Sequence, residues 1–242
     1  MKIQRRYCNN ILVGIFLSVF LLTPAYTPAL ASVEDATVNL YCRLRAGGNT
    51  LSASGSGVVI GERGVILTNA HVAQYFLLPE KRGRATARCS VRTGSPAKAR
   101  YDAVALYFPG RWVKENSAEL GKAAPRGTGE NDFALLAITG AKRGALQKTF
   151  PTLPVDTTVA SGLSEAAVTI AGYPSEGLDF DEVNRSLALT TASSTITDTR
   201  SFARGGTDIL TLAPSAAGAT GVSGGPVIDG DGEVLGIATT KS

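Results

Sequence analysis

The sequence has 242 residues and a formal net charge of +4 at pH 7. Three of its 24 lysines and arginines lie among the first 31 residues, which hold no acidic residue, so residues 32–242 carry 21 basic against 20 acidic side chains. This near-neutral balance, without a basic stripe interleaved with aromatic residues, argues against nucleic acid as a partner. The 211 residues left when 31 are removed from 242 are enough for one two-lobed domain with its own core.

The first 31 residues predict a secretory signal peptide. Basic residues precede an apolar run from Ile11 to Leu22, and Ala29-Leu30-Ala31 fits a small-x-small cleavage site. The run has 12 residues, whereas a spanning helix needs roughly 20, so cleavage is favoured over an uncleaved anchor. We therefore expect an exported protein, periplasmic or secreted, without stable membrane association after removal of residues 1–31.

Short strand patterns with glycine, proline and Asn/Asp turns follow along the rest of the chain, and no long amphipathic helix interrupts them. The longest insertion, residues 109–131, is interpreted as an exposed loop, and the polar stretch 139–156 separates two halves of similar strand count. This spacing predicts an all-β barrel or sandwich. The expected strands are 37–47, 54–61, 64–72, 85–91, 99–108 and 132–138, then 166–174, 185–197, 208–214, 224–229 and 232–240.

Two cysteines follow the predicted signal peptide. Alternation of apolar and polar residues places Cys42 on the buried face of strand 37–47 and Cys89 on the buried face of strand 85–91. In an exported protein such a pair forms either a disulfide or two buried thiols that pack as small apolar groups. The disulfide is favoured if the two strands are neighbours.

Ser223 is a candidate nucleophile, because it lies between glycines in "TGVSGGPVIDGDGEVLGI" near the end of the chain. A glycine-rich serine turn is a weak signal alone. A serine hydroxyl also needs a base, and the only histidine is His71, at the end of the apolar strand "GVILTNAHV". Since no histidine follows Ser223, the order serine, acid, histidine is excluded. The order histidine, aspartate, serine remains, because the only aspartate before His71 is Asp35, just past the cleavage site.

Asp132 is the favoured acid. It ends a polar loop and opens the apolar strand "DFALLAI", which predicts a partly buried carboxylate at a strand end. Asp102 is the alternative, although it lies within strand 99–108. An orienting carboxylate fixes the tautomer of the base and stabilises the imidazolium that forms. The segment Asp229–Glu233 is too short for a calcium loop and predicts a hairpin turn.

Together, "SGSGVVI", "GVILTNAHV", "NDFALLAI", "VTIAGYP" and "GVSGGPVIDGDGEVLGI" resemble the trypsin-like serine peptidases, especially the bacterial HtrA/Deg-like branch. The motifs occur in family order over residues 38–240. The resemblance implies two six-stranded Greek-key barrels of the chymotrypsin-like fold, residues 32–145 and 146–242, with the active site between them. His71 and Asp132 would come from the first barrel and Ser223 from the second.

The resemblance also implies further residue roles. Gly221 and Ser223 would supply oxyanion N–H groups, and Cys42 would pair with Cys89. Ala217 would make the substrate pocket suit a small or apolar residue, with Thr239 and Thr240 beside that pocket. Val222 stands where digestive trypsins have an aspartate that pairs with a freed N-terminus, so that mode of activation is not expected.

We therefore expect an exported serine endopeptidase that acts on polypeptides without a metal or cofactor. No PDZ-like segment follows the peptidase motifs, and the family usually has a further strand after "IATTK". The second barrel is thus expected to be incomplete, to close in another way, or to continue beyond Ser242. The alternative functions are a non-catalytic peptide-binding or scaffold protein on the same fold and an esterase of similar mechanism.

Overall fold

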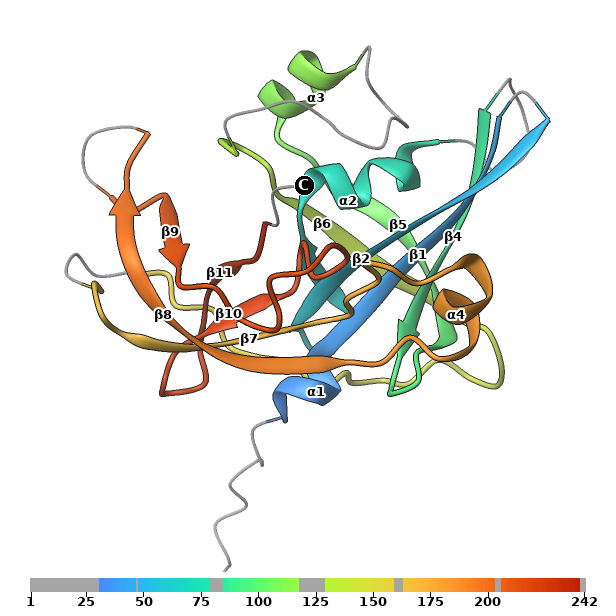
Figure 1. Cartoon of the computed structure of the whole chain (residues 1–242). Coiled ribbons are helices and arrows are strands. Elements are labelled where there is room, and N and C mark those ends of the chain that lie inside the picture. The colour runs from blue at the N-terminus through green and yellow to red at the C-terminus, as the bar shows by residue number, and fades with distance from the viewer. Residues whose placement is uncertain are drawn as a thin grey trace, which may run out of the picture.

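The computed structural model describes residues 31–46, 48–78, 85–117, 129–158, 163–202 and 206–239. Its strands form two units that lie side by side, a closed barrel from the first half of the chain and a curled open sheet from the second (Figure 1). This arrangement confirms the all-β, two-barrel, chymotrypsin-like fold class. The predicted signal peptide lies outside the described residues except for Ala31.

The first barrel has six antiparallel strands in the order β1-β2-β3-β6-β5-β4, and pairing of β1 with β4 closes it. Its interior is filled by apolar side chains that alternate along the strands, among them Val38, Leu40, Ile66, Val91 and Leu136. The strands are β1 (Thr37–Ala46), β2 (Asn49–Gly61), β3 (Val65–Thr68), β4 (Ala85–Thr93), β5 (Lys98–Tyr107) and β6 (Ala134–Ala141).

The second unit is a five-stranded sheet in the order β11-β10-β7-β8-β9. It differs from the expected six-stranded barrel, because the described residues provide five strands and leave β9 and β11 as edges. The apolar cluster of this unit includes Val168, Ile170, Ile196 and Val227. The strands are β7 (Ala167–Gly172), β8 (Thr190–Arg200), β9 (Ile209–Leu212), β10 (Pro226–Ile228) and β11 (Val234–Ile237).

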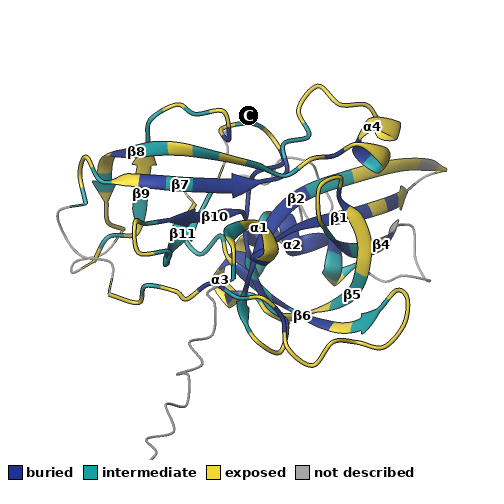
Figure 2. Cartoon of the chain, turned by 90° about the horizontal axis from the view of Figure 1, so that it is seen from below, coloured by how far each residue is buried: buried dark blue, intermediate teal, exposed yellow. Residues whose placement is uncertain are grey.

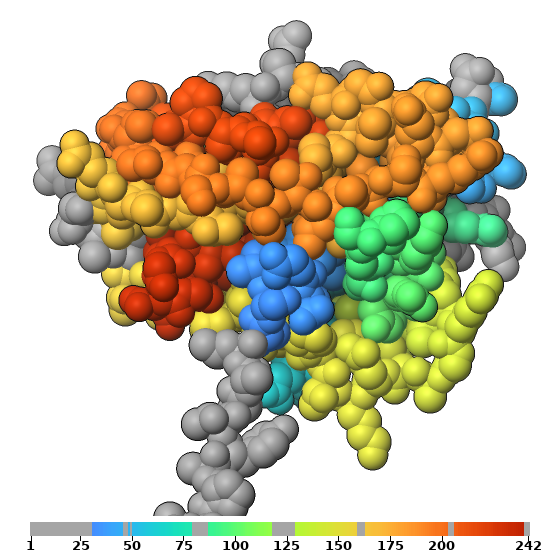
Figure 3. All heavy atoms as spheres, turned by 60° about the horizontal axis from the view of Figure 1, so that its bottom comes forward, coloured from blue at the N-terminus to red at the C-terminus, as the bar shows by residue number. Residues whose placement is uncertain are grey.

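The helical segments are short: α1 (Val33–Ala36), α2 (Ala70–Ala73), the 3₁₀ turn η1 (Gln74–Leu77), α3 (Gly110–Asn116) and α4 (Phe180–Arg185). No helix among the described residues is long and apolar enough to cross a bilayer. The interpretation of 109–131 as an exposed loop was wrong for its first part, because α3 buries Trp112 to 4% exposure beside Phe108. Figure 3 shows α1 between the red C-terminal segments and the first barrel, where Ala36 packs with Ile228 and Val234.

The two units share a buried junction. Figure 2 shows the buried parts of β2, β7 and β10 meeting there. Asn39 and Tyr41 alternate along β1 with the residues that face the barrel interior, yet both are buried. Tyr41 packs against Tyr173, Val183 and Leu187 from the second half of the chain. Arg92 also lies at this junction: its guanidinium stacks 3.7 Å from the centre of the Tyr41 ring and donates to the carbonyl of Val183 at 2.9 Å.

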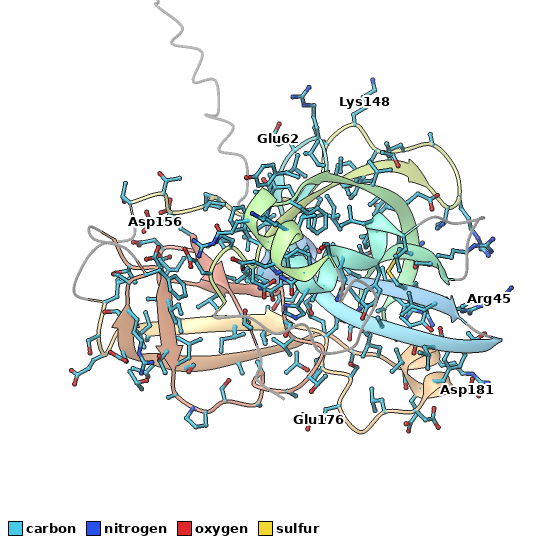
Figure 4. All side chains as sticks on the ribbon, turned by 90° about the horizontal axis from the view of Figure 1, so that it is seen from above. Arg45, Glu62, Lys148, Asp156, Glu176 and Asp181 are labelled. Carbon is cyan, nitrogen blue, oxygen red and sulfur yellow. A yellow bond between two sulfur atoms is a disulfide. The ribbon has the colours of Figure 1, made fainter. Side chains whose placement is uncertain are left out.

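A disulfide joins Cys42 on β1 to Cys89 on β4 (Figure 4). The two cysteines face each other directly in the strand register that closes the barrel. The predicted pairing of Cys42 with Cys89 is therefore confirmed, since the strands are the neighbours that the disulfide requires.

Candidate active site

His71 lies at the end of β3, where the sequence pattern predicted it. β3 ends at Thr68, Asn69 has an extended backbone, and the single-turn helix α2 then carries His71. The Gln74 side chain donates to the His71 carbonyl at 2.8 Å. The His71 side chain is 21% exposed, so the imidazole is accessible at the rim of the barrel.

Asp132 binds His71 through both carboxylate oxygens. Oδ2 lies 2.7 Å from His71 Nδ1, and Oδ1 accepts the His71 backbone N–H at 2.9 Å. Because an ionised carboxylate only accepts hydrogen bonds, this geometry keeps the neutral ring protonated at Nδ1 and leaves Nε2 as the acceptor. The other acid considered, Asp102, instead pairs with Lys142 across β5 and β6.

Asn69 connects this pair to the end of the second sheet, a contact that the sequence analysis missed. Its buried amide donates from Nδ2 to the Asp132 carbonyl at 3.0 Å and to Thr239 Oγ1 at 3.1 Å. Thr239 therefore lies near the His71–Asp132 pair. Thr240 lies outside the described residues.

Ser223 lies on a tight loop at the junction and is 6% exposed. Its carbonyl accepts the N–H of Ser56 on β2 at 2.8 Å. The next residue, Gly224, packs so closely on the first barrel that an added Cβ would lie 2.2 Å from the Thr68 hydroxyl and 3.2 Å from the Asn69 nitrogen. The loop that carries Ser223 thus touches the segment that carries His71.

Two peptide groups of the loop, the one that precedes Gly221 and the one that precedes Ser223, each accept a hydrogen bond at the carbonyl oxygen. Thr220 O accepts from the Ser175 N–H at 2.8 Å, and Val222 O accepts from the Gly225 N–H at 2.8 Å. In a trans peptide the N–H points opposite to the carbonyl, so the N–H groups of Gly221 and Ser223 are turned away from those partners. Oxyanion holes are commonly built from backbone N–H groups.

Gly221 has to be glycine in this loop. Its φ is +99°, and an added Cβ would lie 2.6 Å from the Tyr173 carbonyl oxygen. Both observations favour a residue without a side chain. Next to it, Val222 is fully buried in the apolar cluster of the second sheet, and Ala217 belongs to the same cluster at 1% exposure. These two side chains therefore belong to an apolar cluster that packs against the loop.

A group of three acidic residues and the single residue Glu176 lie apart from the His71–Asp132 pair. Carboxylate oxygens of Asp156, Asp229 and Glu233 lie within 4.8 Å of one another, and all three residues are partly exposed. Asp229 Oδ1 accepts the backbone N–H groups of Asp231 and Glu233, as expected for the predicted β10–β11 hairpin turn. We assign no ion to this group. Glu176, at the molecular surface (Figure 4), accepts the Thr220 N–H at 3.3 Å and so braces the Ser223 loop.

The family model of the trypsin-like peptidase domain matches residues 55–237. The match begins just before Ser56 and ends with β11, so it includes His71, Asp132 and the Ser223 loop, whereas Thr239 lies beyond it. A comparison with curated proteins gives no match. Because the matched residues make up more than half of the chain, it belongs to the family of trypsin-like peptidase domains.

Proposed function

We propose that this protein is an exported serine endopeptidase that works through an acyl-enzyme. In this proposal Ser223 is the nucleophile, His71 the general base and acid, and Asp132 the residue that orients His71. The two-point contact between Asp132 and His71, beside the Ser223 loop, is the observation that carries the proposal.

Acylation begins when His71 Nε2 takes the hydroxyl proton of Ser223 while the serine oxygen attacks a peptide carbonyl carbon. The Asp132 carboxylate stabilises the imidazolium at Nδ1 without taking its proton. The carbonyl oxygen becomes an oxyanion, and the N–H groups of Gly221 and Ser223 are the proposed donors. One donor of this kind is typically worth about 2.7–4 kcal/mol in the transition state.

Collapse of the tetrahedral intermediate breaks the carbon–nitrogen bond, and the imidazolium gives its proton to the leaving amine. Water then attacks the acyl-enzyme while His71 takes one of its protons. When the ester bond breaks, the imidazolium returns that proton to Ser223 Oγ and the acid product leaves. Each proton passes through His71 alone, in keeping with its position as the sole histidine of the sequence.

The substrates proposed are polypeptides with a small or apolar residue before the cleaved bond. The buried, uncharged pair of Ala217 and Val222 supports this preference, because neither offers a charge to a substrate side chain. Export is supported by the Cys42–Cys89 disulfide, since disulfides persist in oxidising compartments. Placement in the HtrA/Deg-like branch stays a prediction from the sequence motifs.

The test compares the chain from Ser32 onward with its Ser223→Ala variant on an unfolded protein substrate. New N-termini are identified by mass spectrometry, and peptide binding is measured separately by fluorescence anisotropy. We expect cleavage by the wild type and binding without cleavage by Ser223→Ala. Binding without cleavage by both would replace the proposal with a peptide-binding function, and hydrolysis of esters alone would replace it with an esterase.

A further inference from the structure

Ser56 contacts the candidate catalytic segments of both units. It lies in the middle of β2 and is fully buried. Its hydroxyl donates to the Gly221 carbonyl at 2.8 Å and accepts the Tyr173 N–H at 2.9 Å. Its backbone donates to the Ser223 carbonyl at 2.8 Å and accepts the Thr68 hydroxyl at 2.6 Å.

The hydroxyl of Ser56 holds the one peptide group that lies between the two proposed oxyanion donors. That group joins Gly221 to Val222, and its other end is held by the bond from the Val222 N–H to the Ala219 carbonyl at 3.2 Å. Rotation of this peptide changes ψ of Gly221 and φ of Val222, two of the angles that set how the flanking peptide groups, which carry the Gly221 and Ser223 N–H donors, are oriented relative to each other. Glycine is the residue at which such rotation costs least, because it lacks a Cβ.

We propose that Ser56 is a positioning residue that keeps the oxyanion site formed before substrate binds. The Ser56 hydroxyl donates its single proton to the Gly221 carbonyl and accepts a hydrogen bond from the Tyr173 N–H, so the group acts as both donor and acceptor. The kinetic part of this inference rests on the proposed peptidase function. Ser56 itself touches no reacting atom in this account and acts through the orientation of Gly221.

Ser56→Ala isolates the side-chain contribution, because it removes the hydroxyl and keeps the backbone bond to Ser223. Ser194→Ala is the matched control, since Ser194 on β8 also donates to a backbone carbonyl at 2.8 Å, that of Ala213. We expect kcat on a peptide substrate to fall about tenfold to hundredfold in Ser56→Ala with KM within about twofold, below the ~10²–10³-fold loss for removing a donor outright. An unchanged kcat, or an equal loss in Ser194→Ala, would overturn the proposal.

A second readout does not depend on turnover. In ¹H–¹⁵N spectra of the folded protein, we expect the amide resonances of Gly221 and Val222 to broaden or double in Ser56→Ala and to stay single in Ser194→Ala. Unchanged resonances in Ser56→Ala would overturn the positioning role. Should the wild type cleave nothing, the proposed function fails on its own, and the spectra still decide whether Ser56 holds this peptide.

Discussion

Replacing Asp132 with asparagine tests how the orienting residue acts. In the structure both carboxylate oxygens accept hydrogen bonds from His71, one from Nδ1 and one from the backbone N–H. Asparagine has nearly the same shape but offers one accepting oxygen and one donating amide. If the asparagine oxygen keeps the hydrogen bond from the His71 backbone N–H, the asparagine NH₂ group faces Nδ1. Nδ1 must then accept a hydrogen bond instead of donating one. The proton therefore moves to Nε2, and His71 can no longer take a proton from Ser223.

The expected loss follows from this change of tautomer. In serine peptidases, asparagine in place of the orienting aspartate lowers kcat about 10⁴-fold, which corresponds to about 5.4 kcal/mol in the activation free energy. We expect Asp132→Asn to lose activity by that order while melting close to the wild-type temperature. The assay is the rate of ester or peptide hydrolysis under saturating substrate, with thermal unfolding followed in parallel.

Asp102→Asn is the matched control for this substitution. Asp102 pairs with Lys142 on the first barrel, away from the Asp132 carboxylate that binds His71. Its replacement should leave the rate unchanged. A rate for Asp132→Asn within tenfold of the wild type would refute the reasoning, as would an equal loss in Asp102→Asn.

Three further substitutions test other parts of the structure. Gly224→Ala should destabilise the fold by at least about 3 kcal/mol, because its Cβ would lie 2.2 Å from Ser56 O; wild-type melting would contradict this. Removing the Cys42–Cys89 disulfide, which spans 47 positions, should lower the free energy of unfolding measured by urea titration by about 4 kcal/mol. An unchanged urea midpoint would contradict this expectation. Burial raises the pKa of Tyr173 to about 12, so the native state keeps a proton that the unfolded chain loses from about pH 10, and the free energy of unfolding should fall as pH rises through that window. Tyr173→Phe should flatten this fall, and an equally steep fall would assign it to other groups.

Strand positions were predictable because alternation records which face of a strand is buried. The strands expected at 64–72 and 132–138 occur as β3 (Val65–Thr68) and β6 (Ala134–Ala141), although residues 70–72 belong to α2. His71 follows the first of these strands, and Asp132 precedes the second. Chain order then left one arrangement for a serine, a histidine and an aspartate. These inferences needed only local patterns and the scarcity of histidine.

Contacts between the two units were not predictable from local patterns. Asn69 and Ser56 are ordinary polar residues in the sequence, and their importance arises from partners 170 and 165 positions away. Burial of Tyr41 also depends on its contacts with Tyr173, Val183 and Leu187 of the second half of the chain. Helix α3 was missed because its 7 residues, about two turns, contain one large apolar anchor, Trp112, which gives no helical period.

The most direct test of the peptidase account is covalent labelling of the folded protein with a fluorophosphonate, followed by mass spectrometry of the modified peptide. The account predicts one adduct, on Ser223, that is absent in Ser223→Ala and strongly slowed in His71→Ala. A folded protein that stays unlabelled, or a label on another residue that persists in Ser223→Ala, would contradict the claim that His71 activates Ser223.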